Sequence, residues 1–127
     1  MLRETWLPAA PESAPIARSL VRDAAAGHGL GTEAVWDLML ATTEAVANAI
    51  EHGAPCCRGI RLVIEPSEHG MTVEVWDCGR FEATLTPAAL DDTRGRGIPI
   101  IAAVVDTLEL DGNGPPTRVR FAKLSAA

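Results

Sequence analysis

Glu44 and Asn48 lie one helical turn apart in a segment whose apolar residues follow a helical period. Viewed down such a helix, Asn48 is only about 40° from Glu44, and both lie opposite the apolar stripe. A carboxylate and an amide on one face can present oxygen atoms to a hard cation or to its water molecules. The same spacing also fits an ordinary solvated helix face, so by itself it leaves both interpretations open.

A second group, Asp77-Cys78-Gly79, follows an apolar strand-like segment. The Asp77 carboxylate can accept a hydrogen bond from an amino group. The glycine at position 79 has no side chain, so a flat ligand could approach the backbone there. An Asp at this place also fits a simple turn after a strand.

A third group, Arg94-Gly95-Arg96-Gly97, directly precedes an apolar segment that can form a short buried helix. The first N–H groups of a helix are unpaired and its dipole favours anions, so phosphate is a suitable ligand. Arginines add charge-assisted contacts. A plain turn remains the alternative. The spacing is neither that of the GxxxxGK[ST] loop nor that of a strand-to-helix GxGxxG loop, which disfavours both nucleotide folds.

The elements that must position these groups follow from periodicity and turn residues. Helices are predicted over 13–26, with Ser13 as N-cap, over 32–52, and from residue 98 to about 105. In the first helix the predicted apolar stripe is Ile16, Leu20 and Ala24. Alternating residues predict strands over 3–7, 60–65, 71–76, 107–111 and 117–123. Residues 66–70 are predicted to form a turn, and residues 78–96 a long loop with one helical turn near 87–90.

This order predicts an α+β fold: a two-layer sandwich with a mostly antiparallel sheet covered on one face by about three helices. The 127 residues are 47% hydrophobic and 22% charged, which suits one globular domain over 1–127. No apolar run reaches the roughly 20 residues of a membrane helix, and no secretory signal is evident.

Charge and cysteine content narrow the partners. Asp and Glu number 17 against 11 Lys and Arg, a net charge of −6, which disfavours binding to nucleic acid or anionic lipid. The three cysteines form no CxxC pair, and two of them are adjacent. Reduced thiols in a cytoplasmic protein are therefore expected.

Taken in order, these groups resemble the boxes of the GHKL superfamily of ATP-binding domains, and most closely the bacterial anti-sigma-factor serine/threonine kinases. The segment from Glu44 to Gly53 resembles the N-box. Asp77-Cys78-Gly79 matches part of the DxGxG box, and Gly95 to Ile101 resembles the glycine box. Thr117, in the last strand pair, completes the set. The resemblance covers roughly residues 2–124.

The resemblance implies a role for each matched residue. Asn48 would bind Mg²⁺, and Glu44 would be the general base that activates the attacking hydroxyl. Asp77 would accept a hydrogen bond from the adenine amino group, supported by Thr117. The glycines and the arginine of the boxes would accommodate the base and the phosphates: Gly79, Gly95, Arg96 and Gly97.

The resemblance further implies ATP and Mg²⁺ as cofactors and a protein serine/threonine kinase activity. The substrate would be an anti-sigma-factor antagonist of the STAS type, and a sigma factor would be a second partner. It also allows a homodimer. Phe81 stands where the DxGxG box has its second glycine, and the segment 80–94 is short for an ATP lid. The alternative is a nucleotide-gated partner-switching regulator with little or no kinase activity, or the kinase-like module of a larger protein.

Overall fold

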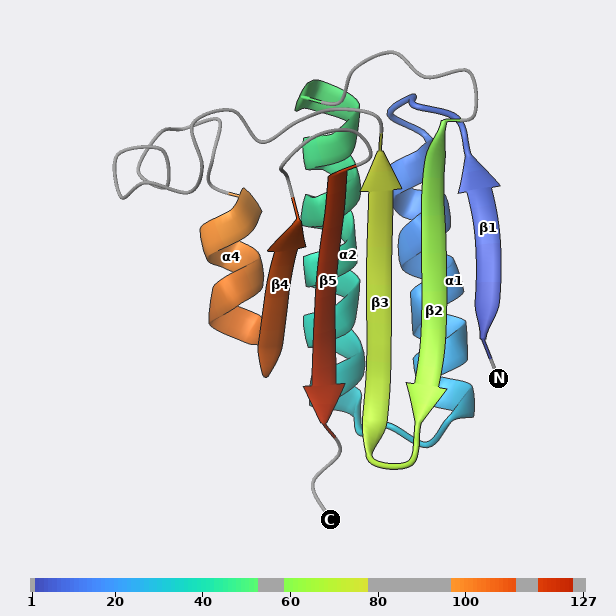
Figure 1. Ribbon diagram of the computed structural model, residues 1–127. Helices are drawn as coiled ribbons and strands as arrows, with labels where there is room; N and C mark the ends of the chain where they lie inside the picture. The colour runs from blue at the N-terminus through green and yellow to red at the C-terminus, as the bar shows by residue number, and fades with distance from the viewer. Residues whose placement is uncertain (1, 53–58, 78–96, 112–116, 125–127) are drawn as a thin grey trace.

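The computed structural model describes residues 2–52, 59–77, 97–111 and 117–124 (Figure 1). The elements follow the predicted order of strands and helices. They are β1 (Arg3–Leu7), α1 (Ser13–Gly27), α2 (Thr32–His52), β2 (Ile60–Ser67), β3 (Gly70–Asp77), α4 (Gly97–Val104), β4 (Thr107–Asp111) and β5 (Thr117–Leu124). The predicted loop over 78–96, with its helical turn, lies outside the described residues.

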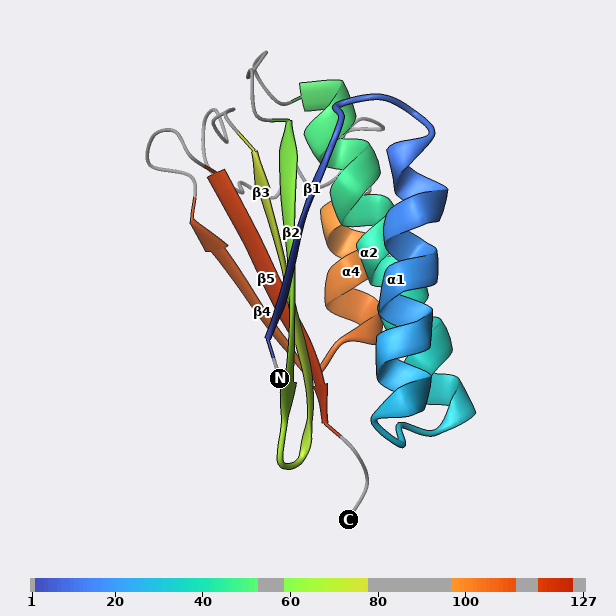
Figure 2. The same ribbon diagram turned by 90° about the vertical axis from the view of Figure 1, so that its right-hand side faces the viewer.

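The five strands form one sheet in the order β1-β2-β3-β5-β4, and every neighbouring pair is antiparallel. Figure 2 shows α1, α2 and α4 together on one face of this sheet, and no helix of the described residues lies on the other face. We call the helix-covered side the inner face and the opposite side the outer face. The arrangement confirms the predicted α+β two-layer fold.

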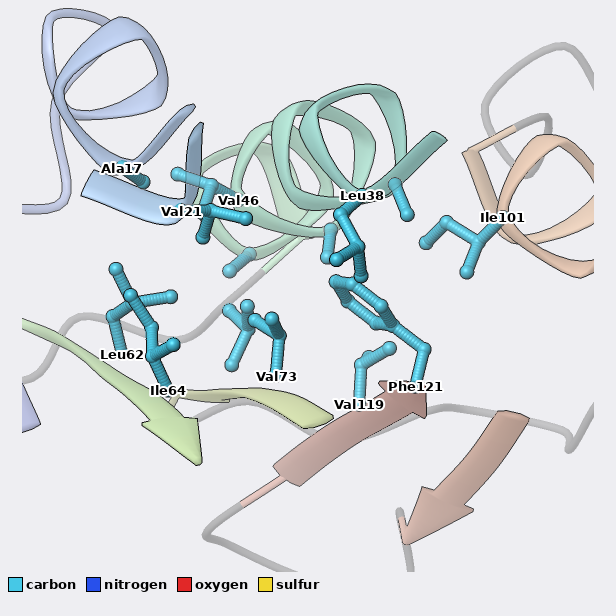
Figure 3. Close-up of a cluster of buried hydrophobic side chains, with 14 of the residues drawn as sticks. Ala17, Val21, Leu38, Val46, Leu62, Ile64, Val73, Ile101, Val119 and Phe121 are labelled. Carbon is cyan, nitrogen blue, oxygen red and sulfur yellow. The ribbon is translucent and has the colours of Figure 1, made fainter. Parts of the chain in front are cut away.

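The core lies between the helices and the inner face of the sheet (Figure 3). Alternate residues of each strand point inward, as the two-residue period of a strand requires. Phe121 of β5 is fully buried and lies opposite Leu38 of α2. Side chains from the three described helices and from β1, β2, β3 and β5 contribute to this cluster, among them Leu7, Ala17, Val21, Leu38, Val46, Ile101, Leu62, Ile64, Val73, Val119 and Phe121.

The first helix buries a different face from the predicted one. Ile16, predicted to be in the apolar stripe, is 46% exposed, and Leu20 and Ala24 are only partly buried. The fully buried positions lie one residue further along the helix, at Ser13, Ala17, Val21 and Ala25. These residues are mostly small, which allows α1 to lie close to α2 and to β2, against both of which it packs.

Ser13 is also not the N-cap that the sequence predicted. The helix begins at Ser13, and Glu12 precedes it without capping it through its side chain. The Ser13 hydroxyl is buried and donates a hydrogen bond to the Pro8 carbonyl. A buried hydroxyl needs such a partner, and the chain between β1 and α1 turns back to supply it.

The hairpin between β2 and β3 is tighter than predicted. Ser67 pairs with Gly70, so only two residues form the turn and Pro66 belongs to β2. The pairing of β1 with β2 ends at Arg3 and Ile64. At Pro66 the strand therefore has β3 as its one partner, and a missing N–H is tolerated in such an edge position.

None of the helices within the described residues is both long and apolar enough to cross a membrane.

Candidate functional site

The predicted site residues that the structure describes belong to elements that reach one end of the molecule. In Figure 1 the C-terminal end of α2, the arrowhead of β3 and the starts of β5 and α4 all lie at the upper end. Glu44 and Asn48 lie in the C-terminal half of α2, Asp77 ends β3, Thr117 begins β5, and Gly97 begins α4. Gly79, Gly95 and Arg96 lie outside the described residues.

Glu44 and Asn48 are half-buried and lie beside the interior. On the flank of α2 next to Asn48, Ala41 is 0% and Ala45 is 1% exposed. Both alanines belong to the hydrophobic core, and α2 packs against α1, α4 and the sheet. The Glu44 carboxylate and the Asn48 amide therefore lie at the boundary between the protein core and the solvent.

Another acidic residue on the same face of α2 forms an ion pair away from the candidate site. Asp37, nearly two turns before Glu44, forms an ion pair with Lys123, with Oδ2 and Nζ 3.0 Å apart. Lys123 is near the end of β5, whereas Thr117 is its first residue. The ion pair therefore joins α2 to β5 near the opposite end of the strand from the candidate site.

Asp77 and Thr117 are brought together by strand pairing. They are register partners and form the last pair of the β3–β5 ladder at this end. Val75 and Val119, two residues away on each strand, are core residues, so Asp77 and Thr117 belong to the inner face as well. Thr117 is 2% exposed and Asp77 is half-buried. A carboxylate and a hydroxyl thus lie side by side on neighbouring strands, on the face of the sheet that the helices cover.

The start of α4 completes this end. Ile98 and Ile101 are buried in the core and fix the helix against its neighbours. Its first turn, from Gly97, lies at the end of the molecule where β3 ends and β5 begins (Figure 1). The unpaired N–H groups of a first helical turn favour anionic ligands, so phosphate groups suit this end of α4.

These residues fit a nucleotide with Mg²⁺. Magnesium in such complexes takes only one or two oxygen ligands from the protein and the rest from phosphates and water. Glu44 and Asn48 supply oxygens of this kind on one face of α2. Within the described ranges there is no cluster of three or more His, Cys, Asp or Glu side chains that could hold a metal. The oxygen donors here suit a cation that arrives with its phosphate ligands.

A cluster on the outer face, behind Asp77 and Thr117, was not predicted from the sequence. Trp76 pairs in register with Arg118, in the row next to these two residues. Arg61, on the neighbouring strand, contacts Trp76 and also donates two hydrogen bonds to Glu4 of β1. These hydrogen bonds hold the pKa of the Glu4 carboxyl below its ordinary value. The alternation of charged and aromatic residues was visible, but only the register places them side by side.

Comparison with known proteins identifies the family. A family model described as histidine kinase-like ATPase domain matches residues 7–123. The chain belongs to this family. The GHKL resemblance of its sequence motifs is thereby confirmed. No curated protein sequence matches the chain.

Solved structures share the histidine kinase-like fold. The structure of the RsbU and RsbW domains of Rv1364c from Mycobacterium tuberculosis matches 100% of this domain and 33% of its own chain, with 21% identity and a TM-score of 0.79. The Acinetobacter baumannii histidine kinase AdeS matches 100% of the domain and 70% of its own chain, with 13% identity and a TM-score of 0.62. The histidine kinase domain of the Erythrobacter litoralis EL346 blue-light activated histidine kinase matches 92% of the domain and 61% of its own chain, at 16% identity and a TM-score of 0.59. The domain thus spans about a third of the first of these chains.

Proposed function

We propose that this domain binds ATP with Mg²⁺ and transfers the γ-phosphoryl group to a serine or threonine of a STAS-type anti-sigma-factor antagonist. We also propose that it binds a sigma factor and acts in the cytoplasm. The observation that supports the proposal is the pairing of Asp77 with Thr117 at the end of the molecule where α2, which carries Glu44 and Asn48 in its C-terminal half, also ends, in a histidine kinase-like ATPase domain.

Base recognition would fall to Asp77 and Thr117. An ionised carboxylate only accepts hydrogen bonds, so Asp77 suits the amino group of adenine and repels the oxo group that guanine has in its place. The Thr117 hydroxyl can donate as well as accept, and it lies on the paired strand at the same level. Together they would select adenine over guanine.

Phosphate binding and transfer would fall to α2 and α4. Asn48 would contribute an oxygen ligand to Mg²⁺, and the first turn of α4 would face the phosphates. Glu44 would take the proton of the attacking serine or threonine hydroxyl. The hydroxyl oxygen would then bond to the γ-phosphorus, while the bond between that phosphorus and the bridging oxygen breaks and ADP leaves. Phosphoryl transfer depends mainly on positioning and charge neutralisation, which such an arrangement can supply.

The anti-sigma type is supported by the motif resemblance and by the order of the boxes along the chain. The full-length fold match to the structure that contains an RsbW domain accords with it. The alternative is a nucleotide-gated regulator without phosphotransfer. Phe81, at the position of the second glycine of the DxGxG box, is the observation that favours this alternative. The homodimer remains a prediction.

The test is phosphotransfer from labelled ATP to a purified STAS-type antagonist, with wild type and Glu44→Gln. Gln keeps the size of the side chain but cannot take a proton, and a general base contributes about 10²–10⁴-fold to the rate. We expect ATP affinity to stay near wild type and phosphotransfer to fall within that range.

The matched control is Glu33→Gln, an exposed glutamate on the same side of α2 in its first turn. It should leave both affinity and rate unchanged. If Glu44→Gln keeps its rate within about threefold of wild type, far less than loss of a base causes, Glu44 is not the base. If the wild type binds ATP but transfers no phosphate, the regulator alternative replaces the kinase.

A further inference from the structure

A cluster on the outer face of the sheet lies directly behind the proposed adenine site. Trp76 and Arg118 are register partners, one residue from Asp77 and Thr117 on the same two strands. Successive side chains of a strand point to opposite faces, so the first pair lies on the outer face and the second on the inner face. The two pairs share the same end of the β3–β5 ladder.

Trp76 is held from three directions. The guanidinium carbons of Arg61 and Arg118 lie 5.4 Å and 5.6 Å from its ring centroid. Both distances are within the roughly 6 Å range of cation–π attraction. The indole Nε1 donates a hydrogen bond to Glu74 Oε1 at 3.0 Å. These contacts tie β3 to both of its neighbours, β2 and β5.

Arg118 is held by carboxylates on both sides. Its Nη1 lies 3.5 Å from Glu74 Oε2 on β3, and its Nη2 lies 3.4 Å from Glu109 Oε2 on β4. The Arg118 side chain is 24% and the Glu74 side chain 19% exposed. Arg118 Nε is buried and, within the described residues, has no hydrogen-bond partner. A buried unpaired donor carries a desolvation cost, which the two ion pairs and the contact with Trp76 must offset.

The place of the cluster suggests its purpose. Asp77 and Thr117 are the terminal pair of the ladder, where strands tend to open locally. If a base binds against this pair on the inner face, as proposed, side chains on the outer face can add restraint without entering the space of the ligand. Cross-strand side-chain contacts can do so, because each such pair stabilises the register of its strands.

We propose that Glu74, Trp76 and Arg118, which we call the outer clamp, are positioning residues that hold the end of the β3–β5 ladder so that Asp77 and Thr117 meet the adenine base. This inference rests on the proposed ATP site. The outer clamp touches no nucleotide, since its side chains lie on the opposite face. Its effect is on base recognition rather than on the phosphates, whose proposed partners lie on α2 and α4.

The test compares Arg118→Ala with Arg120→Ala. Arg120 is a matched control because it lies near the same two carboxylates, 3.6 Å from Glu74 and 3.7 Å from Glu109. It is two residues further from Asp77 and Thr117 along the strand pair, in the row that pairs Arg120 with Glu74. Both variants lose ion pairs with the same partners, so general electrostatic effects should be similar.

The measured quantity is the ratio of ATP to GTP affinity by calorimetry with Mg²⁺, together with urea unfolding of each variant. A substitution that only destabilises the fold lowers the folded fraction, and it lowers the apparent affinities for ATP and for GTP by the same factor. We expect Arg118→Ala to lower the ratio of ATP to GTP affinity by about tenfold. Losing a residue that supports the residues touching a bound group typically costs about 10- to 100-fold, and tenfold is the lower end of that range. Arg120→Ala should keep the wild-type ratio. Arg118→Lys keeps the charge but not the planar guanidinium over the ring, and should recover the ratio in part.

An unchanged ratio in Arg118→Ala, or an equal fall in Arg120→Ala, overturns the inference. If Arg118→Ala fails to fold, Arg118→Lys decides, because an unchanged ratio in that variant also overturns it. A wild type that binds no ATP, or binds ATP and GTP equally, instead overturns the proposed nucleotide site. The two failures are therefore distinguishable.

Discussion

In the proposed site, Asp77 and Thr117 would limit which base can bind, because one is a half-buried carboxylate and the other a buried threonine at the same level of the sheet. A buried polar group needs a partner, and a ligand that supplies the wrong one leaves a donor or acceptor unpaired. Selectivity by hydrogen bonding is strong for this reason, whereas selectivity by apolar contact is weak. We therefore expect the proposed site to select adenine over guanine rather than to bind all nucleotides alike.

Asn48→Ala tests the metal side of the site. The substitution removes an oxygen ligand while leaving the helix intact, since alanine favours helices. We expect Mg-ATP affinity to fall by about tenfold, equivalent to about 1.4 kcal/mol. Affinity for ATP measured with a chelator in place of Mg²⁺ should stay near wild type. Calorimetry under both conditions checks this, and an unchanged Mg-dependent affinity would remove Asn48 from the metal site.

At the scale of elements, periodicity and turn residues were enough to predict the helices, the strands and their order. The Ile60–Glu65 alternation and the long apolar stripe of α2 are strong local signals. The buried face of α1 was missed because α1 presents small residues such as Ala17 to its neighbours, and Ala is a weaker hydrophobic marker than Ile16. Burial there depends on how closely helices approach, which the local pattern does not contain.

The candidate site was predictable only in part. Glu44, Asn48, Asp77 and Thr117 could be chosen by motif order, and the structure brings their elements to one end. The outer clamp could not be chosen, because the row of Trp76 and Arg118 exists only once β3 and β5 are paired in one register. Contacts between residues far apart in sequence depend on that long-range pairing.

Gly70→Ala tests the packing of β3 against β5. A Cβ at this position would lie 2.1 Å from the Lys123 carbonyl oxygen and 2.9 Å from Leu124 Cα. Both atoms belong to the backbone of a paired strand, so the strands must move apart. Overpacking of this kind costs about 1–3 kcal/mol. Urea unfolding should show a loss of stability in that range.

Gly27→Ala is the matched control for this experiment. At Gly27 an added Cβ would meet nothing within 4 Å. Replacing a glycine in a compatible backbone conformation stabilises by about 0.4–1 kcal/mol through the unfolded chain. We therefore expect Gly27→Ala to be neutral or slightly stabilising. Equal effects of the two variants would contradict the close approach of β3 and β5 at Gly70.

The two faces of the sheet carry different kinds of side chains. The inner face joins the core and ends in the candidate site, whereas the outer face carries charged and aromatic side chains in contact across all five strands. In the proposed arrangement, the outer clamp on the face opposite the helices would restrain the strand ends without entering the space of the ligand.

Calorimetry with Mg²⁺ on the wild type and on Asp77→Asn, with ATP and with GTP, tests whether Asp77 selects adenine. A hydrogen bond to a charged group contributes about 1.5–3 kcal/mol, so the wild type should prefer ATP by about tenfold or more. Asp77→Asn replaces an acceptor with a group that can also donate, so ATP affinity should fall and the preference should narrow. Equal binding of ATP and GTP by the wild type, or an unchanged preference in Asp77→Asn, would contradict the assignment of this end of the molecule as an adenine site.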